Sequence, residues 1–227
     1  SRFLQIFMPR CSPIAIVIRP LRVLNDYEKF IIRDFIPGLN RMGIQIVAGW
    51  TVIIGAYTEI LLEGVSNDLD LLEQALKQSK YKELSDNLLS YVKGYKTKIL
   101  VPSGRTDIYS MDIKEHTVKF SQMWDVISGK RADYERFVSE EYYPLMEAAG
   151  IHVASEWEVF IGDGPHFICE SRVREYETLI DTLQSKEFRK AKTGLKKLVE
   201  NYQSRLLAFH VQKVKGYKSA SYNIINS

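Results

Sequence analysis

This 227-residue chain has little of what usually identifies an enzyme by sequence. Its two cysteines, Cys11 and Cys169, are far apart and fit no CxxC or zinc spacing. It has four histidines that form no HxH, HxxxH or HExxH pattern: His116, His152, His166 and His210. It also has no GxGxxG, P-loop or GxSxG motif. The sequence therefore predicts no metal site, and it leaves the identity of any cofactor open.

Long apolar runs and charge of one sign are also missing. No apolar run approaches the roughly 18 residues that a membrane-spanning helix needs. The N-terminal segment contains basic residues and two prolines, which is unlike a signal peptide. The formal net charge of +3 argues against a dedicated nucleic-acid-binding protein. We therefore predict a cytoplasmic protein without a membrane span and without a nucleic-acid partner, in which two reduced thiols would be ordinary.

What the chain does have is an internal repeat. Residues 27–101 align without a gap on residues 134–208, at a constant offset of 107. The matched pairs include Tyr27 with Tyr134, Pro37 with Pro144, Trp50 with Trp157, Glu63 with Glu170 and Tyr95 with Tyr202. A match of this length indicates that one unit was built twice. We expect a first unit at 1–104 and a second at 105–227, joined by a linker at about 102–115.

Hydrophobic periodicity predicts the order βαββαβ in each unit, the ferredoxin-like arrangement. In the first unit we expect strands at 14–19, 44–54, 57–63 and 95–101, and helices at 26–42 and 68–93. In the second unit we expect strands at 117–127, 151–161, 167–173 and 205–214, and helices at 132–149 and 175–200, the latter in one or two pieces. Ser66 or Asn67 is the expected cap of helix 68–93. Pro144 should kink the helix that contains it.

The segment IQIVAGWTVII is apolar at nearly every position, which predicts a strand buried on both faces. A four-stranded antiparallel sheet with two helices on one face leaves its other face uncovered. Two such sheets in one chain can cover each other. The predicted fold is therefore α+β, with two tandem ferredoxin-like units whose antiparallel sheets pack into an intramolecular barrel with the helices outside.

This pattern resembles a known superfamily. The tandem βαββαβ order, the helix with a central proline (EEYYPLMEAAG) and the Gly-Ile-x-x-x-x-x-Trp entry into a strand resemble the dimeric α/β-barrel superfamily, and most of all the NIPSNAP-type proteins. The resemblance implies that one chain builds a barrel that single-unit members form between two chains. The superfamily includes monooxygenases of antibiotic biosynthesis, small-molecule isomerases and decarboxylases, haem-degrading enzymes and chlorite-dismutase-like proteins. Fold alone therefore does not specify the chemistry.

Strand alternation in the second hairpin predicts one polar face that looks into the barrel. Its members are His152, Glu156, Glu158, His166, Glu170 and Arg172. A turn about Asp163 would pair Glu156 with Glu170, Glu158 with Ile168, Ala154 with Arg172 and Phe160 with His166. Opposed carboxylates lie about 5 Å apart at Cβ and raise each other's pKa, as a general base requires.

We therefore predict Glu170 and Glu156 as catalytic residues with His166 assisting. The predicted ligand-binding residues are Arg172, Glu158, His152 and Glu63. In the first unit, Gly49 is the expected hairpin partner of Glu63. The recurring Trp50 and Trp157 are expected on the helix-facing side as core anchors.

Several interpretations stay open. The polar face can be a structural ion network between the sheets or a ligand site. For the whole chain, we predict binding or transformation of a small organic molecule in the barrel, by cofactor-independent proton abstraction or monooxygenation. The alternatives are a non-catalytic scaffold or interaction module, and haem binding through His210. The sequence does not decide whether the protein is an enzyme, and it is compatible with a homo-oligomer.

Overall fold

The structure is a computed structural model that describes residues 12–20, 24–55, 59–106, 113, 117–214 and 221–224. Cys11, His116 and part of the predicted linker lie outside the described residues. Among the described residues, no helix combines the length and the apolar character that a bilayer crossing requires.

The elements of the first unit follow the predicted order. They are β1 (Ser12–Pro20), α1 (Leu24–Phe30), η1 (Ile31–Phe35), α2 (Ile36–Arg41), β2 (Gln45–Ile54), β3 (Ile60–Ser66), α3 (Leu69–Lys77), α4 (Ser79–Leu89) and β4 (Val92–Pro102). The predicted helix 68–93 is thus two helices that meet at Gln78. Its cap is Asp68 rather than Ser66 or Asn67, because the Asp68 carboxylate accepts the Leu71 backbone N–H at 2.7 Å.

The second unit has the same order. Its elements are β5 (Val118–Val126), α5 (Arg131–Phe137), η2 (Val138–Tyr142), α6 (Tyr143–Ala148), β6 (His152–Ile161), β7 (Phe167–Val173), α7 (Tyr176–Gln184), α8 (Lys186–Leu195) and β8 (Val199–Val214). A further strand, β9 (Ser221–Ile224), was not predicted. The break between α7 and α8 falls at Ser185, which is 107 residues after Gln78.

The first helix of each unit contains a π-helical turn, η1 or η2, directly before its proline segment. Pro37 follows η1 and Pro144 follows η2. Proline has no N–H to donate, and its ring clashes with the carbonyl four residues earlier. A π-turn inserts one extra residue into the helix and is a common form of local irregularity at such points. The irregularity predicted at Pro144 takes this form.

The strands close into a barrel. The two units have the orders β2-β3-β1-β4 and β6-β7-β5-β8, and β4 pairs with β6. Strand β2 also pairs with β8, which returns the order to its start, so β1 to β8 form a closed circuit. Strand β9 adds to β8 beside this circuit. The predicted α+β fold of two ferredoxin-like units packed as a barrel is confirmed.

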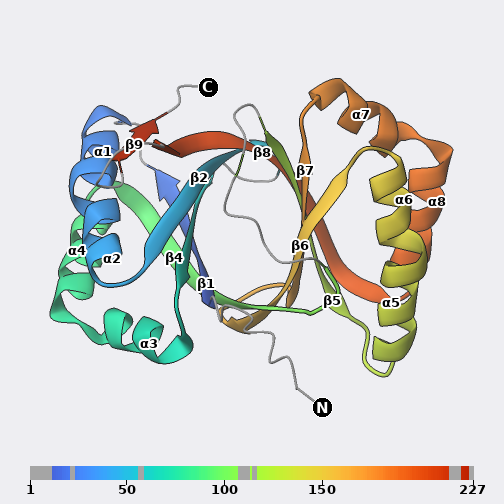
Figure 1. Ribbon diagram of the computed structural model, residues 1–227, viewed down its shortest axis with the longest axis horizontal. Coiled ribbons are helices and arrows are strands. Elements are labelled where there is room, and N and C mark those ends of the chain that lie inside the picture. The colour runs from blue at the N-terminus through green and yellow to red at the C-terminus, as the bar shows by residue number, and fades with distance from the viewer. Residues whose placement is uncertain are drawn as a thin grey trace, which may run out of the picture.

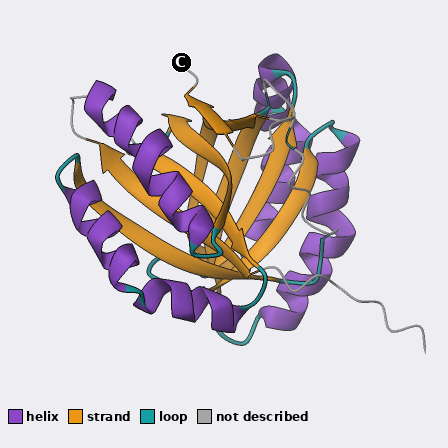
Figure 2. Cartoon of the chain, turned by 60° about the vertical axis from the view of Figure 1, so that its left-hand side comes forward, coloured by secondary structure: helices purple, strands orange, loops and turns teal. Residues whose placement is uncertain are grey.

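The core has three parts, which follow from this layering. Figure 1 shows α1–α4 on one side of the strands and α5–α8 on the other, and Figure 2 shows the helices flanking the curved sheet. In each unit, one apolar cluster lies between the sheet and the helices. The cluster of the first unit includes Leu72, and that of the second unit includes Phe188. A third cluster, with Met123 and Leu207, fills the barrel interior. Each strand therefore has a helix-facing side and a barrel-facing side.

A β-bulge displaces the register of the long strand in each hairpin. In the second unit the register shifts between Val153 and Ser155, so Ala154 is the extra residue. In the first unit it shifts between Ile46 and Ala48, so Val47 is the extra residue. The two bulges are also 107 positions apart. One extra residue moves every following side chain to the opposite face of the sheet.

This bulge makes the predicted pairing of the second hairpin wrong. The observed pairs are His152 with Arg172, Ser155 with Glu170, Glu156 with Cys169, Trp157 with Ile168 and Glu158 with Phe167. Glu156 therefore lies on the helix-facing side of β6, whereas Glu170 lies on the barrel-facing side of β7. The two carboxylates predicted to oppose each other are separated by the sheet.

The same displacement corrects three expectations about the first hairpin and the tryptophans. Trp50 and Trp157 do not face the helices but belong to the barrel cluster. Glu63 pairs with Ala48, and Gly49 pairs with Leu62. Glu63 consequently points into the barrel, where it meets residues of the second unit.

Candidate functional site

The Glu156 carboxyl group is the centre of the first polar cluster. Glu156 is only 1% exposed, between β6 and the helix formed by α5, η2 and α6. Its Oε2 accepts a hydrogen bond from the Tyr134 hydroxyl at 3.1 Å and a second from the Tyr143 hydroxyl. The Tyr134 oxygen in turn accepts the Trp124 Nε1–H at 3.0 Å. We call Glu156, Tyr134, Tyr143 and Arg105 the Glu156 site.

Arg105 covers this carboxyl group from the segment after β4. Its Nε donates to Glu156 Oε1 at 2.7 Å, its Nη2 donates to the same oxygen, and its Nη1 donates to Glu135 at 3.0 Å. The guanidinium carbon lies 5.5 Å from the ring centres of both Tyr134 and Phe167. Arg105 thus contacts both rings and supplies the counter-charge of Glu156.

Backbone contacts hold the Arg105 segment in place. The Ser103 N–H donates to the Glu156 carbonyl at 3.0 Å, and the Glu156 N–H donates to Thr106 Oγ1 at 3.1 Å. These bonds continue the β4–β6 pairing beyond Pro102 and Trp157. The position of Arg105 therefore follows from the way the two units join.

The electrostatics of the site suit proton transfer. Burial raises the pKa of Glu156, although the Arg105 charge and hydrogen bonds oppose this rise. Burial, together with the Glu156 charge, also raises the pKa of Tyr134, so its phenol stays protonated. The site thus places a carboxyl group with a raised pKa beside two phenols and a guanidinium that donate to it, and a carboxyl group of this kind is a candidate general base.

The second cluster, which we call the barrel triad, consists of Glu63, Lys119 and Glu170. Lys119 is fully buried and donates to Glu170 Oε2 at 3.0 Å and to Glu63 Oε1. Glu63 also accepts the Trp50 Nε1–H at 2.9 Å, and the Trp50 ring stacks on Phe209 with centres 4.4 Å apart. Glu63 belongs to the first unit and the other two members to the second, so the triad ties the units together.

The charges of the barrel triad are largely neutralised within the protein, as expected of a structural ion network. Burial raises the pKa of Glu170, and the nearby Glu63 charge raises it further, whereas Lys119 and Arg172 lower it. The two carboxylates share one lysine, and Arg172 adds a second positive charge. The rest of the barrel interior combines apolar side chains with further buried polar groups, among them those of Ser121, Ser155 and Arg205. This arrangement favours the interpretation of a structural ion network for Glu63, Glu170 and Arg172.

The remaining predicted residues lie at the ends of the strands. His166 is 71% exposed, and its Nδ1 lies 2.7 Å from Asp125. His152 is 59% exposed and pairs with Glu147 at 3.1 Å. Glu158 is partly buried and accepts a hydrogen bond from Arg131 at 2.6 Å. The structure therefore does not bring either histidine to Glu156 or Glu170.

His210, the predicted haem ligand, lies in the part of β8 that runs beside β2 of the first unit. It is 8% exposed and its ring stacks on Tyr27 with centres 6.4 Å apart. Burial lowers the pKa of His210, so the imidazole is neutral at neutral pH. Haem binding through His210 stays a prediction.

Four members of the two clusters were not predicted as site residues: Lys119, Tyr134, Tyr143 and Arg105. Lys119 could have been found, because a charged residue stands between the apolar Val118 and Phe120 near the start of the predicted strand 117–127. Tyr134 and Tyr143 lie in the predicted helix 132–149, where no local pattern distinguishes a site residue from a core residue. Arg105 lies in the predicted linker, and no local pattern indicates its long-range contact with Glu156.

No protein-family model matches the chain, and no curated protein matches it. Solved structures do share the fold. A candidate monooxygenase from Fusobacterium nucleatum superposes with a TM-score of 0.60 at 10% identity, over 88% of this chain and 92% of its own. An anthrone oxidase-like protein gives 0.61 at 8% identity over 89% and 92%. A candidate chlorite dismutase gives 0.58 at 11% identity over 89% and 95%.

These similarities show the fold and leave the chemistry open. The ferredoxin-like α/β-barrel fold predicted from the sequence is therefore shared with these neighbours. A NIPSNAP family protein from Agrobacterium tumefaciens covers 40% of this chain with a TM-score of 0.34. That match is too partial to show the NIPSNAP-type assignment.

Proposed function

We propose that this protein binds a small organic molecule at the Glu156 site and transforms it by cofactor-independent acid–base chemistry. The observation that carries the proposal is the Glu156 carboxyl group itself. It is buried, its pKa is raised, and two phenols and one guanidinium converge on it. A carboxyl group in such surroundings is a candidate general base.

The proposed substrate is a ketone with an acidic C–H bond near its carbonyl group. Ionised Glu156 would remove the proton, and the Tyr134 and Tyr143 hydroxyls would donate to the oxygen on which negative charge develops. The resulting carbanion would react with dioxygen as co-reactant. Anthrone and one dioxygen molecule would give anthraquinone and one water, with both hydrogens of the reacting carbon leaving in the water. Similarity of fold to an anthrone oxidase-like protein makes anthrone a reasonable probe.

Arg105 controls access in this proposal. Its guanidinium occupies the space between Glu156 and the Tyr134 and Phe167 rings, so a ligand must displace it. The segment that carries it is held by hydrogen bonds, which can open without unfolding either unit.

The test is anthrone binding under nitrogen, measured by native mass spectrometry. We expect one bound anthrone on the wild type and a larger bound fraction on Arg105→Ala, because the ring-lined space is then free. Arg131→Ala is the matched control, since Arg131 also lies 5.2 Å from the Phe167 ring but makes no hydrogen bond to Glu156. Absence of binding by both wild type and Arg105→Ala, or an equal gain in Arg131→Ala, would refute the proposed site.

A second candidate function has its own support. The packed barrel interior and the balanced barrel triad favour a non-catalytic scaffold or interaction module. The binding test separates the two, because a scaffold gains nothing from removal of Arg105. The NIPSNAP-type assignment, the unit boundary at 104/105, a cytoplasmic location and a homo-oligomer rest on the sequence and stay predictions.

A further inference from the structure

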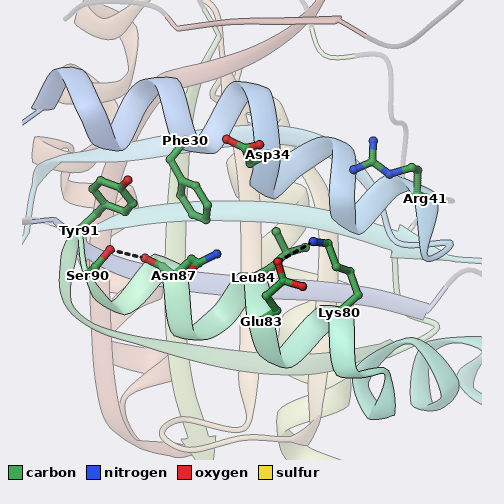
Figure 3. A pocket seen from close by; sticks show the side chains of 9 residues that line it. All are labelled: Phe30, Asp34, Arg41, Lys80, Glu83, Leu84, Asn87, Ser90 and Tyr91. Carbon is green, nitrogen blue, oxygen red and sulfur yellow. Dashed lines mark hydrogen bonds and ion pairs between the residues drawn. The ribbon is translucent and has the colours of Figure 1, made fainter.

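The helical layer of the first unit has an open groove. It lies between the helix formed by α1, η1 and α2 and the facing helix α4 (Figure 3). Its volume is about 370 Å³, within the size range of small-ligand pockets. Phe30 and Leu84 are buried apolar side chains at its base, and Tyr91 stacks on Phe30 with ring centres 5.1 Å apart. Charged side chains line its rims.

Comparison of the two units explains why the groove is open. In the second unit, the ring of Phe137 packs directly on Gly194 of α8, where an added Cβ atom would lie 2.7 Å from the ring. The positions 107 residues earlier are Phe30 and Asn87. Because Asn87 has a Cβ atom, Phe30 cannot take the corresponding position, and it stacks on Tyr91 instead. The groove therefore results from specific side chains of the first unit.

Two opposite charges on one rim are available to a ligand. Asp34 and Arg41 are exposed, and within the described part of the chain neither makes an ion pair or a side-chain hydrogen bond. On the facing helix, Lys80 is already paired with Glu83 at 2.8 Å. Figure 3 shows Asp34 and Arg41 along the upper helix, with Asp34 nearer to Phe30.

The spacing of these charges sets the size of the ligand. Seven residues correspond to about two helical turns, roughly 10 Å along the axis. The long Arg41 side chain is expected to lean back toward the N-terminus of the helix, which shortens this gap. An extended chain advances about 3.3–3.6 Å per residue, so two or three residues bridge the two charges.

We propose that this groove binds a short zwitterionic peptide, independently of the Glu156 site. The terminal ammonium group lies at Asp34 and the terminal carboxylate at Arg41. The first side chain of the peptide packs on Phe30 and Tyr91, so an aromatic N-terminal residue fits best. Free peptide ends are the chemistry that distinguishes this ligand from an internal segment of a protein.

The test is titration of the ¹⁵N-labelled protein with the tripeptide Phe-Gly-Gly, followed by NMR chemical shifts. The same tripeptide with an acetylated amine and an amidated carboxylate is the ligand control. We expect saturable shifts confined to the helix formed by α1, η1 and α2, to α4 and to Tyr91, with the free tripeptide only. Asp34→Asn and Arg41→Gln should each weaken binding about 3- to 5-fold, the upper end for an exposed ion pair.

Glu141→Gln in the second unit is the matched protein control, because Glu141 is exposed and occupies the position equivalent to Asp34. It should leave the affinity unchanged. Three outcomes would overturn the proposal: no saturable shifts with the free tripeptide, equal binding of the blocked tripeptide, or equal weakening by Glu141→Gln. None of these outcomes depends on anthrone binding at Glu156.

Discussion

Lys119 provides the sharpest test of the physical account, because it neutralises two carboxylates inside the barrel. It is fully buried and contacts Glu63 and Glu170. Replacing it by methionine keeps most of the side-chain volume but leaves both carboxylates without their shared cation. Removal of one member of a buried ion pair costs about 3–5 kcal/mol. For a chain of this size, that loss corresponds to a melting temperature lower by roughly 6–20 °C.

The deficit should depend on pH. Burial raises the pKa of Glu170 above its ordinary value of 4.5. The contribution of such a group to stability is therefore complete below 4.5 and declines as the pH rises through its folded-state pKa. Lys119→Met removes a charge that lowers this pKa, so the penalty is largest at neutral pH and shrinks as acid protonates the carboxyl groups. Urea unfolding at pH 5 and pH 8, followed by tryptophan fluorescence, measures both values.

A compensating variant tests the charge balance of the barrel triad. Combining Lys119→Met with Glu63→Gln and Glu170→Met removes the three charges of the barrel triad and keeps an acceptor for Trp50 Nε1–H. This variant should recover most of the lost stability, since a buried ion network often contributes little beyond an apolar replacement. A loss below about 1 kcal/mol for Lys119→Met, or an equal loss at both pH values, would refute the description of the triad.

Three further predictions compare matched positions. Tyr134→Phe should lower the unfolding free energy by about 1–2 kcal/mol, because it removes the hydrogen bonds to Trp124 and Glu156. Tyr27→Phe should change it by less than about 0.5 kcal/mol, because the buried Tyr27 hydroxyl has no hydrogen-bond partner among the described residues. Denaturant titration of both variants measures the two values. Gly49→Ala should cost about 1–3 kcal/mol, since its Cβ atom would lie 2.8 Å from a neighbouring side chain, while Gly94→Ala has open space and should cost far less in the same assay. Because burial raises the pKa of Glu156, its contribution to stability should fall as the pH rises through that pKa, so the melting temperature of Glu156→Gln relative to the wild type should increase from acid to neutral pH.

The elements of the fold could be predicted because hydrophobic periodicity and helix-stop signals are local. Gly43 and Gly150 both have positive φ, and each ends the first helix of its unit as expected. The closed barrel followed from β2, which is too apolar to have a solvated face. These inferences need no knowledge of exact pairing.

The candidate site could be predicted only in part, because faces depend on register. Glu156 and Glu170 are both buried and both have raised pKa values, but the bulge at Ala154 sends them to opposite sides of the sheet. Strand alternation assigns the faces of β6 on the assumption of an unbroken register, so it does not locate the bulge. Arg105 could not be predicted at all, since its contact with Glu156 spans 51 residues and depends on the β4–β6 junction.

The central claim is that Glu156 is the base of a small-molecule site. The most direct test is anthrone-dependent oxygen uptake in air by the wild type, Glu156→Gln and Glu170→Gln, with folding of each checked by its melting curve. The account predicts that Glu156→Gln loses about 100-fold or more of the wild-type rate, the usual contribution of a general base, whereas Glu170→Gln retains it. A wild type without activity above the protein-free rate, or a Glu156→Gln variant as active as the wild type, would contradict the claim.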